Sequence, residues 1–90
     1  MSTTDRTEPT RTESPAEQLQ DLPPSSKLVY TVLEREGRLS QGRIAEETLL
    51  PKRTVRDAVA RLEEIGAVES QFAFSDARKR LYRVREEFTA

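Results

Sequence analysis

The chain has 90 residues, a length that fits one small domain with a modest hydrophobic core. It contains no cysteine and no histidine, which excludes disulfides, thiolate metal sites and histidine-based acid–base catalysis. We therefore expect no enzyme, no catalytic site, no bound metal and no cofactor. No apolar run reaches the length of a membrane span and no signal-peptide core follows Met1, so we expect a cytoplasmic location.

The N-terminal segment, residues 1–22, is predicted to be an acidic, polar tail. Up to residue 13 it consists almost entirely of Ser, Thr, Glu, Arg and Pro, a composition typical of disorder. The sequence from Ser14 to Glu17 fits a helix capping box, which indicates a short helix near 14–22 carrying Leu19 and Leu22. Pro23 and Pro24 end that helix, and residues 23–90 are expected to form the folded domain.

Three helices follow in the predicted domain. The first is capped by Ser25 or Ser26 and ends at Gly37, and Arg38 and Leu39 provide one rung of a strand. The second runs from Gln41 to Thr48 with Ser40 as its N-cap. The third covers 52–65, because its apolar residues recur with the period of a helix that buries one stripe: Val55, Ala58, Val59, Leu62 and Ile65.

A two-stranded hairpin is predicted after Gly66, where the apolar period changes to two. The first strand extends from Val68 to Phe74, the turn covers residues 75–78, and the second strand covers 81–85. Aromatic residues alternate along these strands, and we expect them to pack in the core and the hairpin rather than to stack on bases. These residues are Phe72, Phe74 and Tyr82.

Basic residues gather at two places. Lys52 and Arg53 occupy the first turn of helix 52–65, where the helix dipole disfavours cations unless an anion binds there. A simpler explanation is that Arg53, Asp57 and Arg61 pair with one another at i, i+4 spacing. The second place is the hairpin, with Arg78, Lys79, Arg80, Arg83 and Arg85, where the alternative is a charged edge strand that resists aggregation.

Four segments resemble a winged helix-turn-helix domain. Residues 39–45 are similar to the entry of the first helix of the turn unit, and 50–56 to the entry of a recognition helix. Residues 62–68 are similar to the exit into the wing, and Asp76-Ala77-Arg78 resembles the wing tip of MarR-type regulators. The resemblance covers roughly residues 23–85, and small prokaryotic, archaeal-type regulators are closest. It implies an α+β, mostly α fold: a three-helix winged helix-turn-helix with a C-terminal two-stranded β-hairpin wing.

The resemblance also implies a function, a DNA-binding transcriptional regulator. Helix 52–65 would enter the major groove of double-stranded DNA, and the basic wing, residues 75–85, would meet the minor groove or the backbone. The expected DNA-binding residues are Ser40, Gln41, Lys52, Arg53, Thr54, Arg56, Asp57, Arg61, Arg78, Lys79 and Arg80. Ser40 is equally explained by its N-cap role, and Asp76 is expected to brace Arg78.

The expected partners are duplex DNA and a second copy of the chain. A homodimer would form through the first helix or the segment around Leu19 and Leu22. No small-molecule effector or membrane partner is evident. The alternative function is a winged-helix protein-interaction module without direct DNA contact, which suits the net charge of −1 and the acidic tail.

Overall fold

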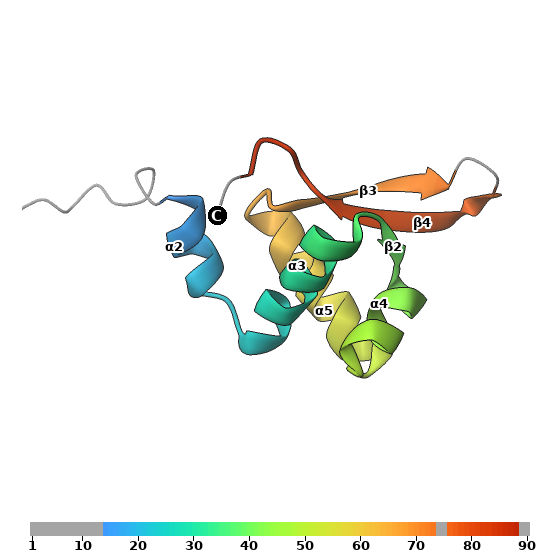
Figure 1. Ribbon diagram of the computed structural model, residues 1–90, viewed down its shortest axis with the longest axis horizontal. Helices are drawn as coiled ribbons and strands as arrows, with labels where there is room; N and C mark the ends of the chain where they lie inside the picture. The colour runs from blue at the N-terminus through green and yellow to red at the C-terminus, as the bar shows by residue number, and fades with distance from the viewer. Residues whose placement is uncertain (1–13, 74–75, 89–90) are drawn as a thin grey trace, which may run out of the picture.

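A computed structural model describes residues 14–73 and 76–88, with the side chains of residues 76–78 excepted. The predicted disorder of residues 1–13 lies outside this part of the chain. Within it the elements follow one another in the order shown in Figure 1. They are α2 (Pro15–Gln20), α3 (Pro24–Glu36), β2 (Leu39–Ser40), α4 (Gln41–Thr48), α5 (Lys52–Glu64), β3 (Val68–Ala73) and β4 (Asp76–Val84).

The core lies where α3, α4 and α5 pack against one another and against the sheet. Each helix turns its apolar stripe inward because burying a Leu, Ile or Val side chain stabilises the fold by about 1.5–3 kcal/mol. Helix α5 buries four of the five residues that the sequence period places on one face, whereas Ile65 is its C-cap and only partly buried. Ile44 of α4 is fully buried in the same core. The buried residues of α5 are Val55, Ala58, Val59 and Leu62.

The start of α3 differs from the expectation. The helix begins at Pro24 with Pro23 as its N-cap, and no side chain caps it. The predicted caps, Ser25 or Ser26, are wrong because a proline can occupy the first helical position, where no N–H bond is lost. Ser26 instead lies in the third position, is 0% exposed, and its hydroxyl has no hydrogen-bond partner among the described residues.

Helix α2 has the capping box that the sequence predicts. The Ser14 hydroxyl accepts a hydrogen bond from the Glu17 N–H at 3.2 Å, and the Glu17 carboxylate accepts one from the Ser14 N–H at 3.0 Å. Leu19 and Leu22 are partly buried against the core, as is Phe88 near the other end of the chain. Phe88 meets the ring of Tyr30 edge-on, with the two centroids 5.7 Å apart.

The three strands form an antiparallel sheet in the order β2-β4-β3. Strand β2 pairs Leu39 with Tyr82, and this short strand therefore ties the helix-turn-helix part to the hairpin. The predicted turn at residues 75–78 is too long, since β4 already begins at Asp76, which pairs with Ala73. The register shifts between Phe72 and Ala73, and the sequence signal of Ser75 and Asp76 does not reveal such a shift.

The turn between α4 and α5 contains a strained residue. Leu49 caps α4 with φ at 61°, the left-handed region in which glycine is the usual residue. Its side chain is 89% exposed. The Thr48 hydroxyl supports the turn, donating to the Ile44 carbonyl at 2.7 Å and accepting from the Leu50 N–H at 3.3 Å. By contrast Gly66, with φ at 77°, provides the expected glycine after α5.

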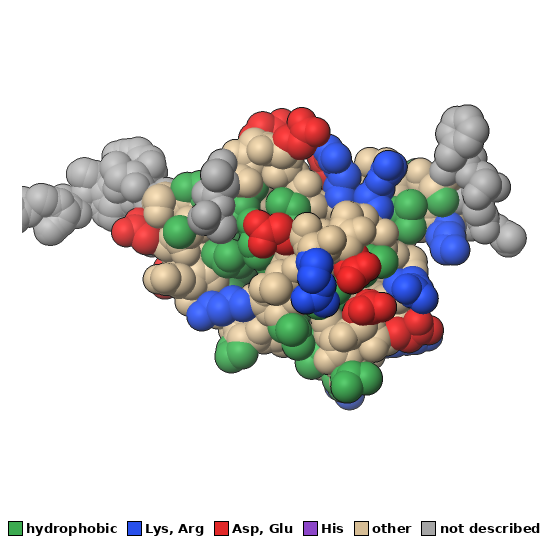
Figure 2. All heavy atoms as spheres, in the orientation of Figure 1, with side chains coloured by type: hydrophobic (Ala, Val, Ile, Leu, Met, Phe, Trp, Pro, Cys, Tyr) green, Lys and Arg blue, Asp and Glu red, His purple; other side chains and the backbone are tan. Residues whose placement is uncertain are grey.

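The face of the molecule drawn in Figure 2 carries acidic and basic side chains intermixed, without one dominant sign. Arg43 on α4 pairs with Glu46 and Glu47, one turn further along the helix. Across residues 14–73 and 76–88, no helix is long and apolar enough to cross a bilayer.

Candidate nucleic-acid interface

Helix α5 has exposed basic side chains at its N-terminal end. Lys52, Arg53 and Arg56 are exposed, and none of them makes an ion pair with another described residue. Pro51 is the N-cap, so no side chain bonds the free N–H groups of the first turn. Free N–H groups together with neighbouring cations make this helix end favourable for an anion such as a phosphate.

The outward face of α5 lies opposite the buried stripe. At 100° per residue, Arg53, Asp57 and Ala60 fall near the centre of this face, and all three are exposed. Thr54 lies at its edge and is half-buried. Because Ala60 has only a methyl side chain, a partner surface could approach the helix closely at this position, between the longer side chains around it.

One of the two possible ion pairs along this face is present. Arg61 Nε lies 3.0 Å from Asp57 Oδ2, and both side chains are exposed. Such exposed i, i+4 pairs stabilise a helix by about 0.3–0.5 kcal/mol. Arg53, on the other side of Asp57, makes no such pair. The structural explanation therefore fits Arg61 but not Arg53.

The base of the wing is neutralised by acidic side chains. Arg83 Nη2 lies 2.7 Å from Glu69 Oε2, and these two residues face each other across the β3–β4 register. Arg85 lies 4.0 Å from the other oxygen of Glu69 and 3.3 Å from Glu87. Glu69 is thus a residue whose role only the strand register reveals. Of the five hairpin cations, Arg83 and Arg85 are engaged within the domain.

The outer part of the wing is exposed. Lys79 and Arg80 are both exposed on β4. The side chains of Asp76 and Arg78 lie outside the described part, and the predicted brace between them stays a prediction. The backbone register pairs Phe72 with Arg80 and Ala73 with Asp76, so that residues 77–79 lie between these two pairs on β4.

The aromatic residues of the hairpin have different environments. Tyr82 is buried, at 5% exposed, as predicted for a packing residue. Phe72 is 58% exposed and packs within the hairpin, not in the core. Its ring is covered by a cation instead, since the Arg80 guanidinium carbon lies 5.3 Å from the ring centroid. Phe74 lies outside the described residues.

The start of α4 is joined to the wing. The Ser40 hydroxyl accepts from the Arg43 N–H at 3.2 Å, which is the predicted N-cap. Gln41 Nε2 donates to the Tyr82 hydroxyl at 3.2 Å. A hollow of about 410 Å³ lies between these elements. It is lined by Ser40, Gln41, Phe72, Lys79, Arg80 and Tyr82.

The predicted site residues therefore fall into two groups. Ser40, Gln41, Lys79 and Arg80 line one hollow, although they lie some forty residues apart in the sequence. The second group lies on α5 alone: Lys52, Arg53, Thr54, Arg56, Asp57 and Arg61. The hollow at Ser40 and Gln41 has no residue of α5 in its lining, so one ligand that contacts both groups would have to extend beyond this hollow.

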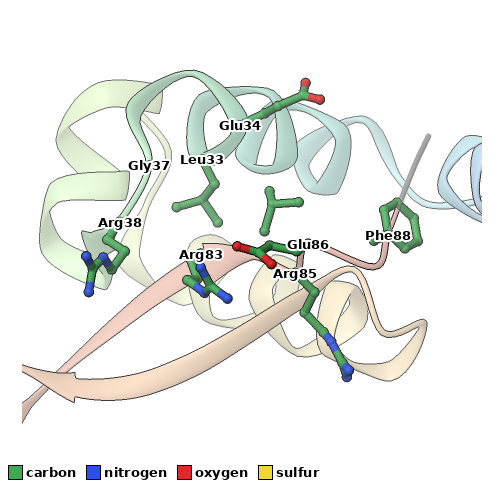
Figure 3. Close-up of a pocket in the computed structure, with 9 residues that line it drawn as sticks. Leu33, Glu34, Gly37, Arg38, Arg83, Arg85, Glu86 and Phe88 are labelled. Atoms are coloured by element: carbon green, nitrogen blue, oxygen red, sulfur yellow. The ribbon is translucent and has the colours of Figure 1, made fainter.

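A further hollow, of about 380 Å³, lies between the C-terminal end of α3 and the end of β4 (Figure 3). Leu33 points into it, whereas Glu34 points away. Two of its arginines have partners elsewhere: Arg83 pairs with Glu69, and Arg38 donates to Gln71 Oε1 at 3.1 Å. Glu69 neutralises Arg83, whereas Gln71 is uncharged and Arg38 keeps an exposed positive charge beside this hollow.

Solved structures of similar fold include proteins described as transcriptional regulators. PcaV from Streptomyces coelicolor, solved with its natural ligand, is 25% identical with a TM-score of 0.70, over 76% of this chain and 48% of that one. BpsR from Bordetella bronchiseptica is 22% identical with a TM-score of 0.71, over 74% and 48%. A ZitR mutant from Lactococcus lactis is 25% identical with a TM-score of 0.71, over 80% and 49%.

The chain thus spans about half the length of these structures. The expected resemblance to the DNA-binding core of MarR-type regulators is confirmed for the fold. No curated protein matches the chain in sequence. The family model described as winged helix-turn-helix DNA-binding matches residues 24–69, from the start of α3 into β3. With half of its residues covered by that model, the chain belongs to the winged helix-turn-helix DNA-binding family.

Proposed function

We propose that this protein is a DNA-binding transcriptional regulator. Helix α5 would lie in the major groove, and the wing would contact the minor groove or the backbone of the same duplex. The observation that carries the proposal is the exposed, unpaired basic end of α5 within a fold of a DNA-binding family. The role is one of binding rather than catalysis, and it would be performed in the cytoplasm of a prokaryotic cell.

The proposed contacts divide into two kinds. Lys52, Lys79 and the hollow at Ser40 and Gln41 would hold phosphates, because ammonium groups and helix N–H groups bind them without reading sequence. Thr54, Arg53 and Arg56 would read base edges, since arginine matches guanine N7 and O6. Arg78 and Arg80 would act in the wing.

Asp57 and Arg61 are proposed to contribute less to DNA binding than the other site residues of α5. The ion pair between them fixes both side chains on the outward face of α5. Asp57 would accept from a cytosine amino group, or would only orient Arg61. Either role makes the pair a support for the contacts made by Arg53 and Arg56, not their equal.

We also propose that the protein binds DNA as a homodimer. The contact area of one small module is limited, which favours two copies on two half-sites. Leu19 and Leu22 already pack against the core of their own chain, whereas Leu28 on α3 is 40% exposed. Helix α3 is therefore the better candidate for the dimer contact. Light scattering of the purified protein tests this, and a monomeric mass at micromolar concentration would rule it out.

The test of DNA binding is fluorescence anisotropy with a duplex of mixed sequence, measured over a salt series. Binding predicts that log K falls linearly with log salt concentration, with a slope of about −0.9 for each phosphate contact. Lys52→Ala combined with Lys79→Ala should lower the magnitude of that slope by about two, because each removed phosphate contact lowers it by about one. Arg61→Ala is the matched control on the same helix, and it should weaken binding much less.

A protein-interaction module is the second candidate. The intermixed charges of the face in Figure 2 and the neutralised base of the wing favour it. So does the net charge of −1. The same anisotropy series separates the two functions: a protein that fails to bind duplex DNA even at low salt would reject the regulator proposal and leave this one.

A further inference from the structure

Phe72 is an exposed aromatic residue with a defined partner. It lies on β3, is 58% exposed, and pairs across the sheet with Arg80 on β4. The Arg80 guanidinium carbon is 5.3 Å from the ring centroid, within the distance at which a cation is attracted to a ring face. The ring thus lies against the Arg80 guanidinium rather than filling the core.

The pair occupies a fixed point of the hairpin. Phe72 and Arg80 form the last pair before the register shifts toward Ala73 and Asp76. Both side chains line the hollow that also contains Ser40 and Gln41 at the start of α4. The pairing of the two strands fixes the backbone positions of Phe72 and Arg80 opposite each other, so that their side chains extend from neighbouring points of the sheet.

An aromatic partner differs from the carboxylate partners used elsewhere in this domain. Glu69 orients Arg83 and Asp57 orients Arg61, but each carboxylate also cancels the charge of its arginine. A ring orients a guanidinium without adding negative charge. Phe72 therefore leaves the positive charge of Arg80 available to an anion, while the ion pair of Arg83 does not.

We infer that Phe72 is a positioning residue that holds Arg80 ready for a backbone phosphate of duplex DNA. The inference rests on the proposed function and names a residue that this function does not require. Binding would order the long arginine side chain, which normally opposes association. Because the ring has already restricted that side chain, less conformational freedom is lost when the phosphate arrives.

The experiment is a double-mutant cycle measured by anisotropy with a duplex of mixed sequence. Phe72→Leu should weaken binding about two- to fivefold, which corresponds to the strength of an exposed cation–π contact. Phe72→Tyr, which keeps a ring, should bind like the wild type. Arg80→Ala should lower the magnitude of the salt slope by about one. In the Arg80→Ala background, Phe72→Leu should have no further effect.

Two readouts separate positioning from a structural role. A merely structural Phe72 would weaken binding equally with and without Arg80, and that result would overturn the inference. So would wild-type affinity in Phe72→Leu. Independently of DNA, proton NMR should show the Arg80 side-chain protons shifted upfield by the ring, with the shift lost in Phe72→Leu and kept in Phe72→Tyr. If the wild type binds no duplex at all, the proposed function fails first, and this inference fails with it.

Discussion

Replacing Leu49 by glycine should stabilise this domain. Leu49 has φ at 61°, and the left-handed region costs an L-residue about 1–2 kcal/mol relative to glycine. Since its side chain is 89% exposed, almost no apolar contact is lost when it is removed. Glycine offsets part of the gain, because it gives the unfolded chain more freedom, by about 0.4–1 kcal/mol. A net gain of about 0.5–1 kcal/mol remains.

The assay is thermal unfolding followed by circular dichroism. For a domain of this size the gain corresponds to a rise in Tm of about 2–8 °C. Leu49→Ala is the matched control, because it removes the same exposed side chain but keeps a Cβ at a positive φ, and its Tm should stay near that of the wild type. Equal Tm values for the glycine and alanine variants would refute the reasoning, since strain at Leu49 would then contribute nothing.

Three further outcomes are expected. Leu62→Ala should lower the free energy of unfolding by about 2–5 kcal/mol in urea titrations, because Leu62 is 0% exposed at the centre of the core. Arg83→Ala should lower the free energy of unfolding by at most about 1 kcal/mol, because it removes an ion pair with Glu69 near the surface. The same variant should change duplex affinity less than twofold, since Glu69 already engages Arg83. A large loss of affinity would show that Arg83 contacts DNA. The pKa of Tyr30 is raised above its ordinary 10.0, first by burial of the phenol and second by the negative charge of the Glu34 carboxylate. The folded state thus binds the phenol proton more tightly than the unfolded state, and the stability from Tyr30 is present below pH 10 and lost as pH rises through the folded pKa. Urea unfolding at pH 8 and pH 11 should show that Tyr30→Phe loses less stability than the wild type.

Local patterns in the sequence account for most of the fold. The apolar spacing from Val55 to Leu62 predicts the buried stripe of α5, because a helix has one periodicity and burial selects one side of it. Ser40 and Ser14 are found as N-caps because the capping bond spans only three residues. Pro24 and Ser26 both carry a local signal for the start of α3, and the sequence alone does not show at which residue the helix begins.

The candidate site was predictable only in part. The exposed cations at the start of α5 follow from the helix period, and so does the possibility that Arg61 pairs with Asp57. Whether Arg53 or Arg61 would take that pair was open, because both lie four residues away. The sequence does not distinguish the five basic residues of the hairpin from one another. In the structure Glu69 forms an ion pair with Arg83, whereas the Phe72 ring contacts the Arg80 guanidinium.

The order of the helices, their buried faces and the two basic regions can be inferred from local sequence patterns, because these depend on neighbours within one or two turns. Which of the basic residues keep their charge exposed depends on how the folded elements meet. That outcome depends on strand register and on contacts between residues distant in the chain, such as Glu69 with Arg83 and Phe72 with Arg80. A shift of one residue in a strand would move every side chain to the opposite face of the sheet, and the pairing of the folded strands decides which acidic or aromatic side chain lies opposite each cation.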